Sequence, residues 1–373
     1  MRVLISGGGT GGHVSPALAV ADAVRERYPH AAIEFAGAKR GIENKIVPQK
    51  GYKLHAFDII GLSRRLSPDT FKFPFKLISA NMGAKKLIKM FKPDVVIGTG
   101  GYASYPAVRA AAKSGVPAVI IEQDVFPGIA TRMLSKYADL IFICFDKTRE
   151  YLTDTKKGCR IILSGNPISG KAFTTDYTAA RRKLGMDKFF ILSYGGSMGA
   201  LKINESILDV FSGYSSKEDV YHLHATGNRN YNYISEKYNA MFGEKPPNID
   251  LREYIYDMND NMAAADIVIC RSGAITLAEL AAMGKCAVLI PSPNVTNDHQ
   301  SKNAEAYAEK DAALIIRDSE LNGDVLIETI RSLRENKVKR EILQKNIKTF
   351  ANPNASNIIL EGISSLIKKS KSD

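Results

Sequence analysis

The sequence lacks several features that mark membrane-spanning or secreted proteins. No apolar run approaches the roughly 20 residues that a membrane-spanning helix needs. The opening run Met1–Ser6 turns straight to glycine and is too short for a signal peptide. The four cysteines show no C-x-x-C spacing, and Cys144 and Cys270 lie inside apolar runs, which indicates free buried thiols in a reducing compartment. We therefore expect a cytoplasmic protein whose membrane contact is peripheral.

Length and composition fit a soluble protein of two domains. The chain has 373 residues, more than one domain usually contains, so we expect two domains of roughly 150–200 residues each. With 45% hydrophobic and 24% charged residues, disorder is excluded. The 51 Lys and Arg against 39 Asp and Glu give a net charge of +12. This charge favours an anionic partner, whether nucleic acid, a phosphorylated metabolite or an acidic membrane surface.

Short apolar runs alternate with segments of helical period, which is the pattern of βα units in a parallel sheet. The first block of runs comprises Val3–Ser6, Ala32–Ala36, Val95–Gly98, Ala118–Ile121 and Leu140–Phe145, and the alternation resumes at Phe189. Between the blocks, Ser164–Gly170 suits a linker because Gly, Asn and Pro disfavour regular elements. We predict an N-terminal domain at 1–164, a C-terminal domain at 165–352 and a closing helix at 353–373. One face of that helix carries Ile359, Ile363, Leu366 and Ile367.

The two blocks also repeat each other. The segment that begins at Lys188 matches the one that begins at Met1, with glycines at three shared places and Ser197 opposite Thr10. The segment 94–101 likewise matches 266–273. Because two separate turns match in the same order, we predict an α/β fold of two Rossmann-like domains whose parallel sheets face each other across a cleft.

The first glycine turn leaves two ligand classes open. Gly7, Gly9 and Gly12 satisfy G-x-G-x-x-G between a strand and a helix, and Glu34 follows 22 residues after Gly12. This spacing suits NAD in a dehydrogenase. A sugar diphosphate fits equally well, because glycines let the backbone approach a phosphate at a helix N-terminus.

Differences between the repeats separate their roles. His13 stands opposite Ala200 and can take a proton near neutral pH. Glu279 stands opposite Ala107, and a carboxylate there can accept hydrogen bonds from the two hydroxyls of a ribose. The N–H groups near Ala274–Thr276 can meet a diphosphate. We therefore predict nucleotide binding by the second half and proton transfer by the first. His222 and His224 could be imagined as a metal pair, but they have no third ligand nearby in the sequence.

At these residues the chain resembles the MurG family of peptidoglycan glycosyltransferases. The motifs that carry the resemblance are Gly8–His13, Gly100–Ser104, Glu122–Asp124, Gly165–Pro167, Gly195–Ala200, Arg271–Glu279 and Asp298–Gln300 before Asn303–Ala304. It implies the GT-B fold and transfer of N-acetylglucosamine from UDP-N-acetylglucosamine to undecaprenyl-diphospho-N-acetylmuramoyl-pentapeptide, a step of cell-wall synthesis. It also implies that the closing helix returns to the N-terminal domain.

The resemblance also assigns roles to residues. On the donor side it implies contacts from Thr10, Gly11, Gly12, Ser197, Tyr254, Ile255, Arg271, Ala274, Ile275, Thr276, Glu279, His299 and Gln300. Among these, Ser197 and 275–276 would hold the diphosphate, Glu279 the ribose, His299 and Gln300 the sugar, and Ile255 uracil. On the acceptor side it implies Gly12, His13, Tyr102, Ser104, Glu122, Gln123 and Asp124.

This sequence departs from the family pattern at two places. Asp124 stands where the family often has Asn, and Ile168–Ser169 stand where it often has Arg. Asp124 could share the role of base with His13, and Lys171 or Arg271 could replace the missing cation. No Asp-x-Asp pair occurs, so neither a metal-held diphosphate nor a cofactor is expected. Direct attack would invert the anomeric centre.

A basic segment at 62–92 lies between the second and third predicted strands. Its positions Leu77, Ile78, Ala84, Leu87, Ile88 and Phe91 form a helical stripe that is predicted to be core. Phe71, Phe73 and Phe75 fall outside this stripe and are interleaved with Lys72 and Lys76, close to Arg64 and Arg65. Exposed aromatics among lysines favour docking on an anionic membrane surface, and buried phenylalanines on a solvated basic helix are the alternative.

Three other functions of the protein stay open as hypotheses. They are a GT-B enzyme with a diacylglycerol acceptor, the NAD-dependent oxidoreductase, and a nucleic-acid binder, for which no binding motif is present.

Overall fold

The computed structural model describes residues 1–61, 68–214 and 219–372, and the side chains of 1–61, 73–214 and 219–370. The chain divides into two compact units. The N unit is Met1–Ile168 together with Asn352–Asp373, and the C unit is Ser169–Ala351. The predicted basic residues Arg64 and Arg65, and the side chains of Phe71 and Lys72, lie outside the described residues.

The N unit is built on a seven-stranded parallel sheet of order β3-β2-β1-β4-β5-β6-β7. Its strands are β1 Arg2–Ser6, β2 Ala32–Ala38, β3 Lys53–Phe57, β4 Val95–Gly98, β5 Ala118–Glu122, β6 Leu140–Ile143 and β7 Arg160–Leu163. Its helices are α1 Gly11–Arg27, α2 Glu43–Gln49, α3 Pro68–Phe91, α4 Tyr105–Lys113, α5 Ile129–Leu134 and α15 Ala355–Ser372, with 3-10 turns η1 Tyr102–Ser104 and η2 Asp146–Tyr151.

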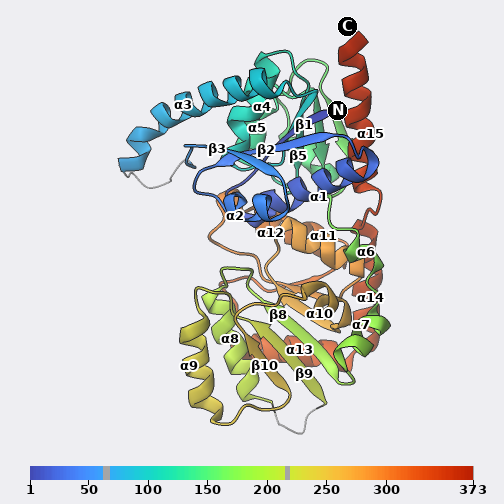
Figure 1. Cartoon of the computed structure of the whole chain (residues 1–373). Helices are drawn as coiled ribbons and strands as arrows, with labels where there is room; N and C mark the ends of the chain where they lie inside the picture. Colours follow the sequence, from blue (N-terminus) through green and yellow to red (C-terminus); the bar gives the residue numbers. More distant parts are fainter. Residues whose placement is uncertain (62–67, 215–218, 373) are drawn as a thin grey trace. The chain divides into compact units, whose positions relative to one another are not determined.

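Both faces of this sheet are buried, because successive strand residues point to opposite sides. In β1, Val3 and Ile5 join the core under α1 and α15, whereas Leu4 joins the core under α3 and α4. The closing helix α15 lies beside α1 (Figure 1) and buries Ile359 and Ile363 against the sheet. The apolar face of that helix is therefore core, with Leu366 only partly buried at its margin.

The C unit repeats the design with a six-stranded parallel sheet of order β10-β9-β8-β11-β12-β13. Its strands are β8 Phe189–Tyr194, β9 Val220–Ala225, β10 Ile249–Arg252, β11 Ile267–Cys270, β12 Ala287–Leu289 and β13 Leu314–Ile315. Its helices are α6 Lys171–Thr174, α7 Tyr177–Leu184, α8 Leu201–Ser212, α9 Tyr231–Phe242, α10 Met258–Ala264, α11 Ala274–Met283, α12 His299–Ala308, α13 Gly323–Glu335 and α14 Lys337–Ile347, with 3-10 turns η3 Thr296–Asp298 and η4 Lys348–Phe350.

The internal repeat is confirmed, with one shift of register. Asp94 accepts a hydrogen bond from the N–H of Arg2 at 2.7 Å, and Asp266 accepts one from the N–H of Phe190 at 2.8 Å. Arg2 is therefore equivalent to Phe190, whereas the sequence match pairs it with Phe189. Matching the glycines caused this error, because apolar strand residues are interchangeable and do not fix the alignment.

The order of strands decides where ligands can bind. In both sheets the first strand of the unit, β1 or β8, lies inside the sheet. The next two strands in the chain are added on one side of it, and the later strands, from β4 or β11 onward, are added on its other side. Loops that leave the carboxyl ends of strands at such a switch point diverge and open a crevice. In the N unit these loops follow β1, β4 and β5, and in the C unit they follow β8, β11 and β12.

The cysteines are only partly as expected. All four, which lie within the described residues, are free thiols. Cys270 and Cys286 are buried, but Cys144 and Cys159 are partly exposed. The prediction of buried thiols is thus wrong for Cys144, which follows the end of β6, and for Cys159, which precedes the edge strand β7.

Candidate functional site

The turn after β1 leads directly into α1. Thr10 precedes the first helical residue, and Thr10, Gly11 and Gly12 are exposed. The helix spans 17 residues and has no acidic residue in its first turn. Unpaired N–H groups and the positive end of the helix dipole therefore favour an anion or a polar ligand here.

His13 lies in that first helical turn, and its ring packs on the backbone of the turn after β4. A Cβ atom at Gly100 would come within 2.6 Å of His13 Nδ1, and one at Gly101 within 3.0 Å of His13 Cδ2. Thr99 Oγ1 donates a hydrogen bond to the His13 carbonyl oxygen at 2.8 Å. The imidazole is thus placed by two glycines that leave no room for side chains.

The loop after β5 brings three predicted acceptor residues to the same end of the sheet. Glu122 is 3% exposed, and its two oxygens accept the N–H groups of Asp124 and Gly128 at 3.1 Å each. Burial, and then the charge of Asp124, raise the pKa of Glu122 to about 7. Gln123 is buried and donates to the carbonyl of Ile121 at 3.0 Å. Glu122 and Gln123 therefore shape the loop that presents the more exposed Asp124.

Tyr102 and Ser104 lie in η1, directly after the turn that holds His13. Ser104 is buried and donates to the carbonyl of Gly101 at 2.8 Å. Tyr102 is partly exposed, and burial, followed by the charge of Glu43, raises its pKa. Of this pair, Tyr102 has the side chain available to a ligand.

The structure contradicts the dinucleotide hypothesis. A ribose-binding acid must stand at the carboxyl end of β2, but Glu34 lies in the middle of that strand, opposite Leu4, and pairs with His55 and Lys53 at 2.6 and 3.2 Å. The end of β2 is Ala38. In addition, the N–H of Gly9 is already taken by the carboxylate of Glu43 at 2.9 Å. A pyrophosphate at this turn would meet a resident carboxylate.

In the C unit, α11 carries the predicted nucleotide contacts. Ala274, Ile275 and Thr276 form its first turn, after Gly273. Glu279 lies one turn further along, and burial raises its pKa to about 7. The N–H groups that suit a diphosphate and the carboxyl group that suits a ribose thus belong to one helix, which begins after β11.

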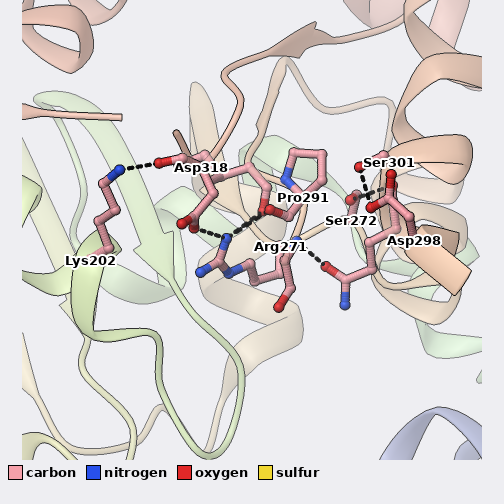
Figure 2. Close-up of polar contacts among 10 residues, drawn as sticks. Lys202, Arg271, Ser272, Pro291, Asp298, Ser301 and Asp318 are labelled. Carbon is pink, nitrogen blue, oxygen red and sulfur yellow. Dashed lines mark hydrogen bonds and ion pairs between the residues drawn. The ribbon is translucent and has the colours of Figure 1, made fainter. Parts of the chain in front are cut away.

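Arg271 is anchored within its own unit. Its Nη1 donates to the carbonyls of Ile290 and Pro291 at 3.1 and 2.9 Å and to Asp318 Oδ1 at 2.6 Å (Figure 2). Lys202 in turn donates to the carbonyl of Asp318. The charge of Arg271 is thus balanced by Asp318, whereas the other proposed cation, Lys171, is exposed at the start of α6.

His299 and Gln300 begin α12 after a constrained turn. Asn297 and Asp298 have φ angles of 56° and 51°, a left-handed conformation that non-glycine residues rarely adopt and that clusters at functional sites. Gln300 Oε1 accepts the N–H of Ser292 at 2.9 Å, which leaves the amide NH₂ as its remaining donor. His299 Nδ1 lies 2.8 Å from the carbonyl of Thr296, so it is the donor in that contact and Nε2 of the neutral ring is an acceptor.

The remaining predicted donor residues lie on loops. Ser197 is exposed in the turn after β8, between Gly196 and Gly199, whose φ angles of 93° and 78° need glycine. Tyr254 is exposed and Ile255 buried in the segment between β10 and α10. All predicted donor contacts except Thr10–Gly12 belong to the C unit.

Sequence reasoning missed a buried hydrogen-bond chain in the C unit. Ser193 Oγ lies 2.7 Å from both His222 Nε2 and His224 Nδ1. His224 Nε2 donates to Asn204 Oδ1 at 3.1 Å, because the Asn204 amide nitrogen itself donates to the carbonyl of Thr226 at 2.9 Å. Burial lowers the pKa of both histidines. The alternating histidines were visible in the sequence, but Ser193 and Asn204 gave no signal because they lie on other elements.

Helix α3 differs from its predicted pattern. Ala84, Leu87, Ile88 and Phe91 are buried as expected, but Ile78 is 57% exposed, so its assignment to the core is wrong. Phe73 is partly buried, Phe75 is 75% exposed, and Lys76 pairs with Asp58 at 3.0 Å. The first turns of α3 therefore extend beyond the sheet, which covers only its later turns. Within residues 1–61, 68–214 and 219–372, no helix is both long and apolar enough to cross a bilayer.

Two Rossmann-like domains in tandem, each with its polar side chains at the carboxyl ends of the central strands, define the GT-B class of glycosyltransferases. The glycosyltransferase family 28 N-terminal domain matches residues 3–143, and the family's C-terminal domain matches residues 190–358.

Full-length relatives narrow the class further. The chain is 38% identical over 370 residues to the UDP-N-acetylglucosamine–N-acetylmuramyl-(pentapeptide) pyrophosphoryl-undecaprenol N-acetylglucosamine transferase of Acetivibrio thermocellus, covering 99% of both chains. It is 40% identical over 354 residues to the enzyme of the same name from Ruminiclostridium cellulolyticum, covering 93% and 94%. The crystal structure of Acinetobacter baumannii MurG superposes with a TM-score of 0.75 at 28% identity, covering 98% of this chain and 99% of that one. The chain belongs to the MurG family within glycosyltransferase family 28.

Proposed function

We propose that this protein transfers N-acetylglucosamine from UDP-N-acetylglucosamine to the muramyl sugar of undecaprenyl-diphospho-N-acetylmuramoyl-pentapeptide, with inversion at the anomeric carbon. The observation that carries the proposal is the end-to-end similarity to transferases of that name. The polar groups at the strand ends of each unit support it, because the C unit offers groups suited to a nucleotide sugar and the N unit offers a base for the attacking hydroxyl.

In this proposal the C unit binds the donor. Glu279 accepts hydrogen bonds from the ribose hydroxyls, and the first-turn N–H groups of α11 stabilise the negative charge that grows on the departing UDP. The amide NH₂ of Gln300 and Nε2 of His299 contact the sugar, and the backbone at Ile255 contacts uracil. No protein-bound metal is needed in this scheme, because helix N–H groups and a cation can stabilise the leaving group.

The N unit supplies the base and binds the acceptor. His13 takes the proton of the attacking hydroxyl, a role worth roughly 10²–10⁴ in rate. Asp124 lies on the neighbouring loop, and Tyr102 flanks the same turn. We assign His13 as the base, with Asp124 oriented by Glu122 to bind the acceptor.

We further propose that α3 docks on an anionic membrane surface. Phe75, Ile78 and Met82 are 75%, 57% and 69% exposed and recur at helical spacing, so they share one face. Exposed lysines follow on the same face at positions 85, 86 and 89. An apolar stripe continued by lysines suits an interface with anionic lipid headgroups, where each basic side chain contributes about 1 kcal/mol.

The decisive experiment measures UDP release from UDP-N-acetylglucosamine with and without the lipid-linked muramyl acceptor. We expect release that depends on the acceptor, and little release from UDP-glucose or UDP-galactose. Transfer to diacylglycerol instead of the muramyl lipid would contradict the proposed acceptor while leaving the enzyme class in place.

A further inference from the structure

Glu43 is a fully buried carboxylate that none of the predicted roles includes. It begins α2, and its relative exposure is 0%. Its Oε2 accepts the N–H of Gly9 at 2.9 Å, and its Oε1 accepts the N–H of Ala38 at 2.9 Å. Each oxygen of one side chain thus binds a different segment, one in the glycine turn after β1 and one at the end of β2.

The surrounding backbone is shaped to receive this carboxylate. A Cβ atom at Gly8, Gly37 or Gly41 would come within 2.2, 2.8 or 2.0 Å of a Glu43 side-chain atom. Three glycines from three segments therefore close around the carboxylate at distances that any side chain would prevent. The glycine turn after β1 therefore packs directly on the side chain of Glu43.

The same turn contacts the groups that we place in the reaction. A Cβ at Gly9 would lie 3.0 Å from the ring of Tyr102. A Cβ at Gly101 would lie 2.2 Å from the carbonyl oxygen of Gly8 and 3.0 Å from His13 Cδ2. The contacts run from Glu43 through Gly8 and Gly9 to Gly101, and from there to the imidazole.

We propose that Glu43 is a positioning residue for sugar transfer, which fixes the glycine turn and through it the imidazole of His13 and the ring of Tyr102. The effect of Glu43 on sugar transfer rests on the proposed function, whereas its support of the glycine turn does not depend on that function. Glu43 contacts no substrate in this scheme. It acts by keeping the base in its productive place, and a misplacement of about 1 Å can cost about 10² in rate.

The test compares Glu43→Gln and Glu43→Ala with the control Glu34→Gln. Glu34 is a partly buried carboxylate on β2 that pairs with His55 and Lys53, away from the turn. We expect kcat to fall about 10²-fold in Glu43→Ala and less in Glu43→Gln, because the amide oxygen still accepts one N–H. The KM for UDP-N-acetylglucosamine and the affinity for UDP stay unchanged, and the pH profile of kcat/KM for the acceptor shifts. The control keeps wild-type values.

Amide hydrogen exchange without substrate provides a second readout. Segment 7–13 is expected to exchange faster in Glu43→Gln, with unchanged exchange in the C unit. Unchanged exchange at 7–13, unchanged kcat, or a loss of UDP affinity equal to the loss of rate would overturn the proposal. If the wild type failed to release UDP, the proposed function would fall, and exchange at 7–13 would still decide whether Glu43 holds the turn.

Discussion

At the scale of single residues, burial decides the chemistry of the acids in this protein. Glu122 and Glu279 have pKa values raised to about 7 by burial. Glu43 is fully buried and binds two backbone N–H groups. These three acids serve different ends: Glu122 shapes a loop, Glu279 lies in the proposed nucleotide site, and Glu43 supports a turn.

Replacing His13 by Ala should separate catalysis from donor binding. The variant removes the proposed base, so turnover is expected to fall roughly 10²–10⁴-fold, while the affinity for UDP measured by calorimetry stays at the wild-type value. The paired variant Glu279→Gln should show the reverse pattern, with weaker UDP binding. Wild-type turnover in His13→Ala would remove this residue from the mechanism.

The affinity for UDP should depend on pH through Glu279. Its pKa is about 7 in the free protein, so the carboxylate that accepts the ribose hydroxyls is present above pH 7 and lost below it. We expect the Kd for UDP to rise as the pH falls from 8 to 6. In Glu279→Gln the Kd for UDP should be higher by about tenfold or more, since a hydrogen bond to a charged group contributes about 1.5–3 kcal/mol. That variant should lack this pH dependence, and a parallel dependence in both proteins would exclude Glu279 as its source.

At the scale of elements, the buried chain between β8, β9 and α8 couples stability to pH. The pKa of His224 is lowered to about 3 from its ordinary 6.5. The unfolded chain therefore takes up a proton below pH 6.5 that the folded protein refuses until about pH 3. Stability on this account is complete above pH 6.5 and is lost as the pH falls, by about 1.4 kcal/mol per pH unit for each such group.

The pH slope should be reduced by His224→Gln. Glu122 and Glu279 act in the opposite sense, since acids with raised pKa values lower stability as the pH rises from their ordinary value of 4.5 to about 7. The informative quantity is therefore the difference between variant and wild type in the free energy of unfolding, measured in urea at pH 4.5 to 7.5. The exposed His30→Gln serves as the control and should leave the slope unaltered.

Helix α3 illustrates how one element can serve both core and surface. We expect the triple variant Phe75→Ser, Ile78→Ser and Met82→Ser to lose binding to anionic vesicles in co-sedimentation while keeping turnover on a detergent-solubilised acceptor. Val338→Ser, which changes a 65% exposed apolar residue on α14, is the matched control. Equal binding of wild type to neutral and anionic vesicles would count against the docking surface.

At the scale of the whole molecule, one of the two units is a continuous segment of the chain and the other is not. The C unit is one stretch, whereas the N unit needs α15 from the end of the chain. Ile363 on α15 is 1% exposed in the N-unit core. Ile363→Ala should therefore lower the free energy of unfolding of the N unit by about 2–5 kcal/mol.

Two unfolding transitions make this prediction measurable. Differential scanning calorimetry should show one transition lowered by Ile363→Ala and the other raised by UDP, which binds the C unit in our proposal. The exposed Lys369→Ala should shift neither transition. A single transition that both changes shift together would show that the units do not unfold independently.

The sequence by itself determined five of the seven strands of the N unit, the internal repeat and the glycine turns, whereas β3 and β7 were not among the predicted runs. Alternating apolar runs and glycines at positive φ are local requirements, so Gly9, Gly100 and Gly196 announce turns without knowledge of the fold. The repeat was evident for the same reason, although its register was off by one residue in β8.

Only the tertiary structure decided which side chains are buried and which distant segments share a hydrogen bond. The exposure of Ile78, the ion pair of Arg271 with Asp318 and the support that Glu43 gives to Gly9 all depend on neighbours far along the chain. Desolvation and long-range pairing arise only when the chain is packed. For that reason the linear pattern located the turns where His13 and Glu279 stand, and packing set their surroundings.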